Sequence, residues 1–289
     1  MIQKIKLWLI IPLVTMIVSI GLIVLIRPVL GIDFTGGSLL EIETKGMVPE
    51  NVGAALEQEL GLTSAVQSGE GSRLLIRTTA LSESQHQEVL RILSEKDILI
   101  EELRFESIGP TIGAELRRKT VMAVAVALVI LVVYLTYTFR KAGGLISPWK
   151  FGVAAIYALV HDLLFVTAMF VILGAWLGVS IDTLFVTAML VILGYSVNDT
   201  IVIFNRAKSD WLSAHSGSLL NILDDANKNS LTRSLNTGFM TLLVLGALLL
   251  LGGPSIRWFI VALIAGITVG TYSSIFVAPP LLYFLAKRR

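Results

Sequence analysis

GYSVNDTIVIFNR, residues 194–206, closes a long apolar run with a carboxylate still inside it. Arg206, about seven residues after Asp199, is the first cation that could mark the water boundary. At helical spacing one face of this segment carries Tyr195, Asn198, Asp199, Val202 and Asn205. We therefore expect this polar stripe to face other helices instead of lipid, and to be the working surface of the protein.

The composition is that of an integral membrane protein. Of 289 residues, 55% are hydrophobic and only 15% are charged, so the chain cannot cover itself with polar surface. A net charge of +2, with the cations at helix ends, argues against nucleic-acid binding. The lack of cysteine excludes disulfides, thiol catalysis and Cys-ligated metals, and the three histidines have no metal-site spacing. We expect no cofactor, no metal and no enzymatic activity.

Six apolar runs are long enough to cross a bilayer as helices. They cover residues 7–26, 121–139, 151–173, 181–204, 235–251 and 256–285. The last is too long for one straight span, so we expect it to tilt, or to break near Pro279-Pro280. Within it, a small residue recurs at every fourth position, which predicts close approach of another helix. These residues are Gly266, Gly270, Ser274 and Ala278.

Residues 31–119 differ in kind, with charges and turn residues that indicate a water-exposed domain. We predict strands at 38–44, 63–67, 73–79 and 98–107, and helices at 49–60 and from the capping box Ser82-x-x-Gln85 to about residue 95, with a turn at 68–71. This order is typical of a ferredoxin-like α+β domain. The predicted organisation is a first transmembrane helix (1–30), an extracytoplasmic α+β domain (31–119) and a five-helix transmembrane bundle (120–289) with a cytoplasmic loop at about 205–234.

Orientation follows from the cations near the ends of the spans. On the side of the N-terminus we count Lys4, Lys6, Arg140, Lys141, Lys150, Arg206, Lys208, Lys228, Arg233, Lys287, Arg288 and Arg289. The short loops on the other side offer only Arg257. Arg117-Arg118-Lys119 oppose this pattern, but they follow a long translocated domain, where the rule is weakest. We predict that both termini are cytoplasmic.

His161 and Asp162 fall near the middle of the third span, where a charged side chain costs at least about 2.5 kcal/mol. Desolvation favours the neutral acid and a nearby cation favours the carboxylate, so such a site can switch between states. Asp162 can therefore be a proton carrier, or it can form a static hydrogen bond to a neighbouring helix.

Asp199 is the stronger candidate for a proton carrier, because Asn198 and Tyr195 on its face can hold either protonation state. Arg233, where the fifth span begins, is a possible counter-charge for Asp199, or an ordinary positive-inside anchor. Asp182, at the outer end of the fourth span, reads as an interfacial helix cap.

Several ordered segments carry a family resemblance. They are GIDFTGG (31–37), IGPTIGAEL (108–116), His161-Asp162, GYSVNDT (194–200), LTRS (231–234), LGGPSIRW (251–258) and GTYSSIFVAPPLL (270–282). With them the chain resembles the SecF family of protein-export membrane subunits, of the SecD/SecF family and the RND superfamily, over nearly its whole length.

The resemblance implies half of an RND-type transporter, with six spans and an outer domain. It implies pairing with SecD, assistance to the SecYEG channel and the SecA ATPase, and use of proton-motive force to export unfolded preproteins across the bacterial-type plasma (inner) membrane. By motif, the proton-linked acid falls on Asp199 and its basic partner on Arg233, while His161-Asp162 matches the His-Asp pair of relatives. The chain departs from many relatives at Asn205-Arg206-Ala207-Lys208 and at Ser234, where Thr is usual.

Other classes of function compete with this interpretation. A subunit that only stabilises the translocon would need no proton-carrying acid. An RND-like half that exports small molecules or lipids would need a substrate cleft, for which the outer domain looks too small. An intramembrane aspartyl protease would also place two acids on adjacent helices, as Asp162 and Asp199 are, but its Gly-x-Gly-Asp context is missing.

Overall fold

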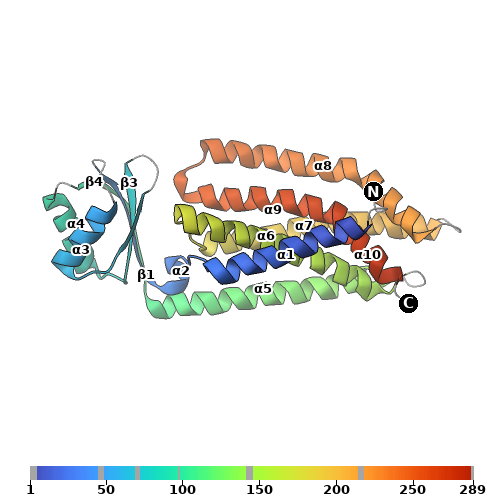
Figure 1. Cartoon of the computed structure of the whole chain (residues 1–289), viewed down its shortest axis with the longest axis horizontal. Coiled ribbons are helices and arrows are strands. Elements are labelled where there is room, and N and C mark those ends of the chain that lie inside the picture. The colour runs from blue at the N-terminus through green and yellow to red at the C-terminus, as the bar shows by residue number, and fades with distance from the viewer. Residues whose placement is uncertain are drawn as a thin grey trace. The chain divides into compact units, whose positions relative to one another are not determined.

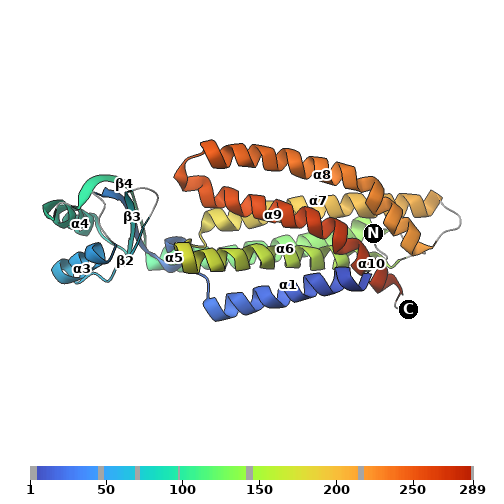
Figure 2. The ribbon, with the colours of Figure 1, turned by 45° about the horizontal axis from the view of Figure 1, so that its top comes forward.

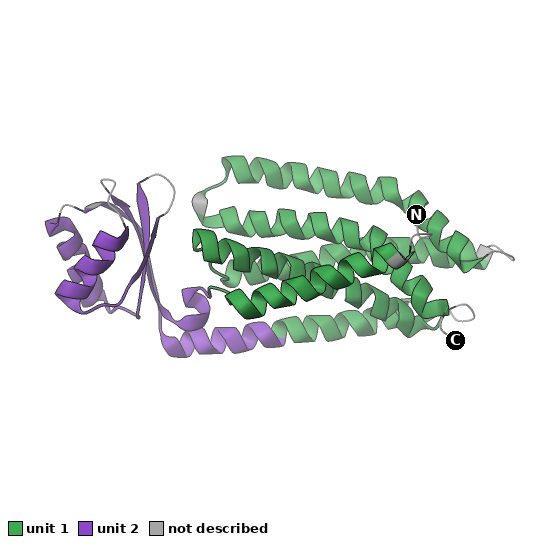
Figure 3. Cartoon of the chain, viewed as in Figure 1, with its two compact units in different colours: residues 1–29, 123–289 green, residues 30–122 purple. Residues whose placement is uncertain are grey.

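The computed structural model describes residues 5–44, 49–68, 72–96, 98–140, 146–213 and 218–287. These residues form two compact units, shown in different colours in Figure 3. Unit 1 comprises Met1–Val29 and Ala123–Arg289, and unit 2 comprises Leu30–Met122.

Unit 2 is built on a small antiparallel sheet. Its elements follow in the order β1 (Gly37–Thr44), α3 (Pro49–Leu60), β2 (Ala65–Ser68), β3 (Arg73–Thr78), α4 (Glu83–Glu95) and β4 (Leu99–Ile108). The strands lie in the order β2-β3-β1-β4, and every neighbouring pair is antiparallel. The predicted strands and helices are thus confirmed, with small shifts at their ends. The predicted turn at 68–71 falls mostly on residues 69–71, outside the described residues.

The core of unit 2 follows from the alternation of its strands. Along β1 the buried apolar residues are Leu40 and Ile42, two positions apart, because successive side chains of a strand point to opposite faces. Helices α3 and α4 lie on one side of the sheet (Figure 1). At the start of α4 the predicted capping box is confirmed, since the Ser82 hydroxyl accepts from the Gln85 N–H at 3.4 Å and the Ser82 N–H donates to Gln85 Oε1 at 2.9 Å.

Within unit 2, residues 31–37 pack against residues 108–116. The one-turn helix α2 (Ile32–Thr35) ends at Gly36 and Gly37, whose φ angles of 73° and 127° favour glycine. A Cβ on Gly36 would lie 2.7 Å from the Cα of Pro110, the first residue of α5 (Pro110–Thr138). Residues 31–37 therefore pack directly against the segment 108–116, which explains why both are rich in small residues.

Unit 1 is a bundle of long apolar helices. They are α1 (Ile5–Ile26), the later part of α5, α6 (Pro148–Leu177), α7 (Thr183–Ser213), α8 (Leu219–Leu251), α9 (Arg257–Phe276) and α10 (Ala278–Lys287). With α9 and α10 taken together, six helices among the described residues are long and apolar enough to cross a membrane, which confirms the six predicted spans. The chain ends of α1 and α10 lie at the same end of the bundle (Figures 1 and 2).

Helices and predicted spans do not have the same ends. The cytoplasmic loop predicted at about 205–234 is mostly helical, because α7 continues to Ser213 and α8 begins at Leu219. The hydropathy falls there, but Ile222, Leu223 and Ala226 are buried against the bundle, so backbone hydrogen bonding continues beyond the apolar run. Among the cations used for orientation, Lys4, Lys141, Arg288, Arg289 and the Lys6 side chain lie outside the described residues.

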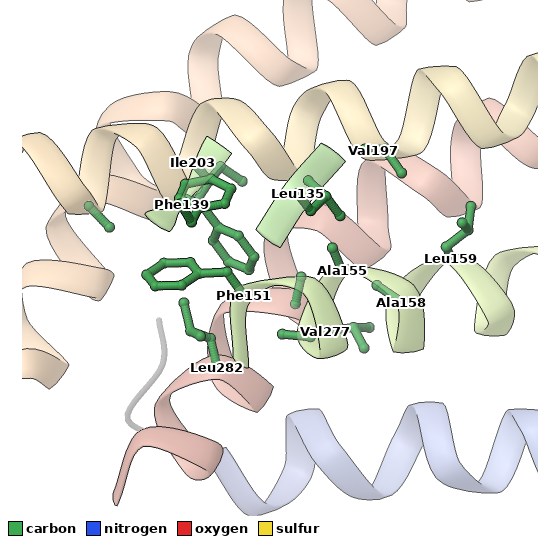
Figure 4. Packing of buried hydrophobic residues seen from close by; sticks show 14 of the residues in the cluster. Leu135, Phe139, Phe151, Ala155, Ala158, Leu159, Val197, Ile203, Val277 and Leu282 are labelled. Atoms are coloured by element: carbon green, nitrogen blue, oxygen red, sulfur yellow. The ribbon is translucent and has the colours of Figure 1, made fainter. Parts of the chain in front are cut away.

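Three aromatic rings pack together in the core where α5 ends and α6 begins, and Figure 4 labels two of them, Phe139 and Phe151. The rings of Phe139 and Phe151 stack with centroids 4.6 Å apart. The ring of Phe204 meets both edge-on, at 6.0 Å from Phe139 and 5.4 Å from Phe151. All three are fully or almost fully buried, so α5, α6 and α7 are fixed to one another at this end.

The sixth predicted span breaks where the prolines predict it. Helix α9 ends at Phe276 and α10 begins at Ala278, so Val277 separates the two helices. Pro279 and Pro280 have no N–H to donate to the preceding turn, which ends α9. N–H groups in the first turn of a helix make no intrahelical hydrogen bond, so proline costs nothing there. The same two prolines can therefore lie in the first turn of α10.

Candidate functional site

Asp162 lies at the centre of unit 1 and is 0% exposed. Its Oδ1 is 3.0 Å from His161 Nδ1. Its Oδ2 accepts two hydrogen bonds of 2.7 Å, from the Ser196 hydroxyl on α7 and the Ser273 hydroxyl on α9. Both carboxyl oxygens therefore have protein partners.

His161 extends these contacts to a fourth helix. Its Nε2 is hydrogen-bonded to Thr15 Oγ1 on α1 at 2.9 Å, and its side chain is buried. We refer to Thr15, His161, Asp162, Ser196 and Ser273 as the Asp162 network. The network joins α1, α6, α7 and α9 by side-chain hydrogen bonds, as polar residues do between membrane helices.

Glycines on α9 bring the Ser196 turn of α7 close enough for these bonds. A Cβ on Gly270 would lie 3.1 Å from the Cβ of Ser196. A Cβ on Gly266 would lie 2.1 Å from Cδ1 of Ile192, one turn before Ser196. The predicted close approach at Gly266 and Gly270 is confirmed, and it positions Ser196 and Ser273 around one carboxylate.

Asp199 is also buried, at 4% exposed, but its surroundings differ. Its Oδ2 has no hydrogen-bond partner in the part of the chain that the structure describes. Within that part of the chain, the buried hydroxyls of Tyr195 on α7, Ser234 on α8 and Thr271 on α9 also lack a hydrogen-bond partner. We refer to Tyr195, Asp199, Ser234 and Thr271 as the Asp199 cluster.

Gly238 on α8 makes room at this cluster. A Cβ on Gly238 would lie 3.1 Å from Thr271 Oγ1 and 3.6 Å from the Tyr195 hydroxyl, so a larger residue would press on both groups. Tyr195 and Asp199 are one turn apart on α7, and Ser234 is one turn before Gly238 on α8. The cluster therefore occupies the line along which α7, α8 and α9 meet.

Arg233 lies near this cluster but does not form an ion pair with its acid. Its charge acts on Asp199, and its neighbour Ser234 faces the same carboxyl group. Arg233 itself is exposed, and among the described residues it forms no ion pair with Asp199 within 4 Å. The cation can thus influence the acid electrostatically without occupying its oxygens.

The two acids consequently have different chemical capacities. A proton added to Asp162 would have to enter an oxygen that already has a partner, His161 at Oδ1 or Ser196 and Ser273 at Oδ2. A proton can reach Oδ2 of Asp199 without breaking a hydrogen bond to any described residue. Of the two carboxyls, only that of Asp199 has an oxygen without a hydrogen-bond partner among the described residues.

The structure divides the predicted site residues between these two groups. His161 and Asp162 belong to one, and Tyr195 and Asp199 to the other. Asn198 is exposed on α7 and lies in neither group. Asp182 caps α7, as predicted, because its Oδ1 accepts from the Phe185 N–H at 2.7 Å.

Five hydroxyl-bearing residues around the two acids are not predicted by the sequence pattern. They are Thr15, Ser196, Ser234, Thr271 and Ser273. A signal was present, since Ser196 and Ser234 lie beside quoted candidates and Thr271 and Ser273 lie in the segment 270–282. A serine or threonine in an apolar helix can, however, also bond to its own backbone, as Thr167 and Thr187 do here, so the signal alone does not mark a site.

The chain is similar to known membrane proteins over most of its length. Residues 88–288 match the family described as protein export membrane protein SecD/SecF, C-terminal, and residues 22–46 match the SecD/SecF GG motif. A protein translocase subunit SecF from Thermobaculum terrenum is 36% identical over 266 residues, covering 88% of this chain and 83% of the relative. A protein translocase subunit SecF from Synechocystis is 35% identical over 271 residues, covering 90% of this chain and 83% of the relative.

Two solved structures have the same fold. The crystal structure of SecDF from Thermus thermophilus, a translocon-associated membrane protein, aligns with a TM-score of 0.89 at 30% identity over 99% of this chain. SecDF in a super-membrane-facing form aligns with a TM-score of 0.68 at 30% identity over 96% of this chain. This chain spans 38% and 37% of those two longer chains.

Proposed function

The chain belongs to the SecF group of the SecD/SecF family of protein-export membrane proteins, and from this membership we propose that it couples proton movement to the late stage of preprotein export. It would do so as an integral membrane subunit of the Sec translocase, together with SecD, which would supply the other half of an RND-type bundle. The observation that carries the proposal is the buried Asp199 carboxyl, whose Oδ2 is unpartnered among the described residues and lies beside Arg233 and Ser234.

A proton on Asp199 would change the forces between α7 and α8. The carboxylate attracts Arg233 and accepts hydrogen bonds, whereas the neutral acid has no net charge and can donate to a hydroxyl such as that of Ser234. Alternation between these states would shift the packing of α7 against α8. We propose that this shift moves the domain formed by residues 31–119, which would lie outside the cytoplasm, and that this domain promotes release of the preprotein.

Exposed polar residues on α7 and α8 support the proposal that a partner protein packs against these two helices. Asn198 is exposed on α7 and Arg233 on α8, within helices whose other exposed residues include Phe239 and Leu243. Uncovered polar side chains of this kind would face lipid, which is unfavourable. A SecD half packed on α7 and α8 would cover them, and the SecYEG channel, SecA and unfolded preproteins are the further partners that this function requires.

The orientation and the class of the inserted domain are part of the same proposal. The cation distribution supports cytoplasmic termini in the plasma membrane, and α1 begins at the end of the bundle where α10 ends. The strand order β2-β3-β1-β4 and the order of elements support a ferredoxin-like domain. Such a fold names no function by itself, and we assign the domain a binding or positioning role.

Preprotein release from inverted membrane vesicles tests this function. The vesicles would contain SecYEG, SecA, SecD and this chain, either as wild type or as Asp199→Asn, in complexes shown to be intact. We expect a proton gradient to stimulate release with wild type and not with Asp199→Asn, while ATP-driven release without a gradient stays equal.

Asp210→Asn is the matched control for this experiment. It makes the same chemical change on the same helix, but Asp210 is part of an ion pair with Arg206 at 3.2 Å outside the Asp199 cluster. Stimulation should survive in this variant. If stimulation also persists in Asp199→Asn, then Asp199 is a packing residue and the chain acts only as a structural subunit of the translocon.

A further inference from the structure

The break between α9 and α10 leaves the carbonyls of Ile275 and Phe276 without their helical donors, because residues 279 and 280 are both proline. In an uninterrupted helix the Ile275 carbonyl would accept from the N–H of residue 279, which is proline. On either side the usual pattern holds, since the Val277 N–H donates to the Ser273 carbonyl at 2.9 Å and the Leu281 N–H donates to the Val277 carbonyl at 3.1 Å. The bonds lost to the two prolines therefore lie between these two flanking bonds.

A side chain from another helix replaces the donor missing at Ile275. Asn227 of α8 donates from Nδ2 to the Ile275 carbonyl at 2.9 Å. Asn227 is 0% exposed, and its Oδ1 has no partner within the described ranges of the chain. The amide thus serves this position as a donor, which is the function that Pro279 cannot perform.

Asn227 also lies between the two polar groups. On α8 it shares a buried face with Ser230 and Ser234, at spacings of three and seven residues, and Ser234 belongs to the Asp199 cluster. On α9 its acceptor Ile275 is two residues after Ser273, which donates to Asp162. One hydrogen bond therefore links the helix that faces Asp199 to the turn that holds Asp162.

We propose that Asn227 is a positioning residue for the proposed proton coupling. By donating to Ile275 it fixes the register of α8 against the α9–α10 break, and so holds Ser234 at Asp199 while Ser273 holds Asp162. Without this bond α10 would have a less defined position against α8, and a change at Asp199 would be transmitted poorly. The functional part of this inference, that Asn227 helps to transmit a change at Asp199, rests on the proposed function. The structural part, that Asn227 fixes the register of α8 against the break, does not.

A double-mutant cycle with Pro279 tests the structural part. Asn227→Leu keeps the approximate size of the side chain and removes the donor, and Pro279→Ala returns a backbone N–H to position 279. Because the chain has no cysteine, spin labels can be placed on cysteines introduced at the exposed positions Asp225 on α8 and Lys287 on α10. Asn229→Leu, an exposed change on the same helix, is the matched control.

We expect the label-to-label distance distribution to broaden in Asn227→Leu, to stay narrow in Asn229→Leu, and to narrow again when Pro279→Ala is added to Asn227→Leu. Should Asn227→Leu alone fail to reach the membrane, recovery of folded protein by Pro279→Ala would be the same rescue. An unchanged distribution in Asn227→Leu, or a broadening that Pro279→Ala leaves in place, would overturn the inference.

The same variants in the vesicle assay test the functional part. We expect gradient-stimulated release to fall about threefold in Asn227→Leu, as for the loss of one interhelical hydrogen bond in a membrane, and to recover in the double variant. The distances are measured without a gradient, so they are independent of the Asp199→Asn result. Suppose that Asn227→Leu broadens the distances, that Pro279→Ala restores them, and that Asp199→Asn leaves the stimulation by the gradient intact. This combination would refute the proposed function but not the positioning role of Asn227.

Discussion

Asp162 and Asp199 are two aspartates buried in one helical bundle, yet their hydrogen bonding is opposite. Asp162 has partners from its own helix and from α7 and α9. Asp199 has an Oδ2 without a partner among the residues described, next to three hydroxyls in the same condition. Burial alone therefore does not distinguish the two acids, whereas their hydrogen bonding does.

The comparison also separates two uses of polar groups in a membrane. A saturated network specifies how helices meet, because each lost partner leaves another group unsatisfied. An unsaturated cluster retains capacity for a proton or a new hydrogen bond, so it can have two states of similar energy. The following four predictions test this difference by stability measurements on the purified full chain, from the largest expected effect to the smallest.

Asp162→Ala should have the largest effect. It removes the acceptor of Ser196 and Ser273 and the partner of His161 together, so we expect a loss of at least about 3 kcal/mol in unfolding free energy. Thermal denaturation in detergent measures it. Asp210→Ala, which removes an acid from an ion pair on the same bundle, should change stability by less than about 0.5 kcal/mol. Equal effects of the two variants would remove the basis for calling the network structural.

Gly270→Ala should have the second-largest effect. The new Cβ would lie 3.1 Å from the Cβ of Ser196, so α9 must move away from α7 and lengthen the bonds to Asp162. We expect a loss of about 1–3 kcal/mol, as for overpacking in a core, followed by the same thermal measurement. The control is Gly246→Ala on α8, where a Cβ would meet no described atom within 4 Å and alanine should be neutral or slightly stabilising.

Thr15→Val should have a smaller effect, at the edge of the network. It removes the hydroxyl bonded to His161 Nε2 and leaves all three hydrogen-bond contacts of Asp162 in place. The expected loss is about 0.6 kcal/mol, the average for side-chain bonds between membrane helices. Thr187→Val removes an exposed hydroxyl that bonds only within α7 and should change nothing measurable. A loss as large as that of Asp162→Ala would mean that Thr15 and His161, not the carboxylate, organise the network.

Asp199→Asn should have the smallest effect on stability. Oδ2 has no hydrogen bond to lose within the described chain, and asparagine has nearly the same shape, so we expect a change within about 0.5 kcal/mol. The same thermal measurement applies, and the variant should still assemble. A loss comparable to that of Asp162→Ala would show that Asp199 also has a structural role, and the comparison between the two acids would fail.

The sequence was sufficient for the features that depend on local signals. Apolar runs predict the six spans, turn residues and alternation predict the elements of the sheet, and Pro279-Pro280 predicts the break after α9. Asp199 could be singled out because a charge inside an apolar run is itself a local signal.

The sequence was not sufficient for the partners of the acids. Ser196 and Ser273 are 77 residues apart, as their numbers show, and they meet only because Gly266 and Gly270 set the register of α9 on α7. Asn198 was grouped with Asp199, but neighbouring residues on a helix point about 100° apart, and only Asp199 faces the interior. Asn227 gave no local signal at all, since its role depends on a proline 52 positions later in the chain.

The most direct test of the central claim is infrared difference spectroscopy of the full chain reconstituted in lipid, recorded between acidic and alkaline buffer. The carbonyl band of a protonated carboxyl group reports the proton itself. Among the carboxyl bands of the 21 acidic residues, we expect one component to be present in wild type and in Asp162→Asn and absent in Asp199→Asn. A band that disappears in Asp162→Asn and persists in Asp199→Asn would contradict it, because the hydrogen-bonded acid would then be the one that exchanges the proton.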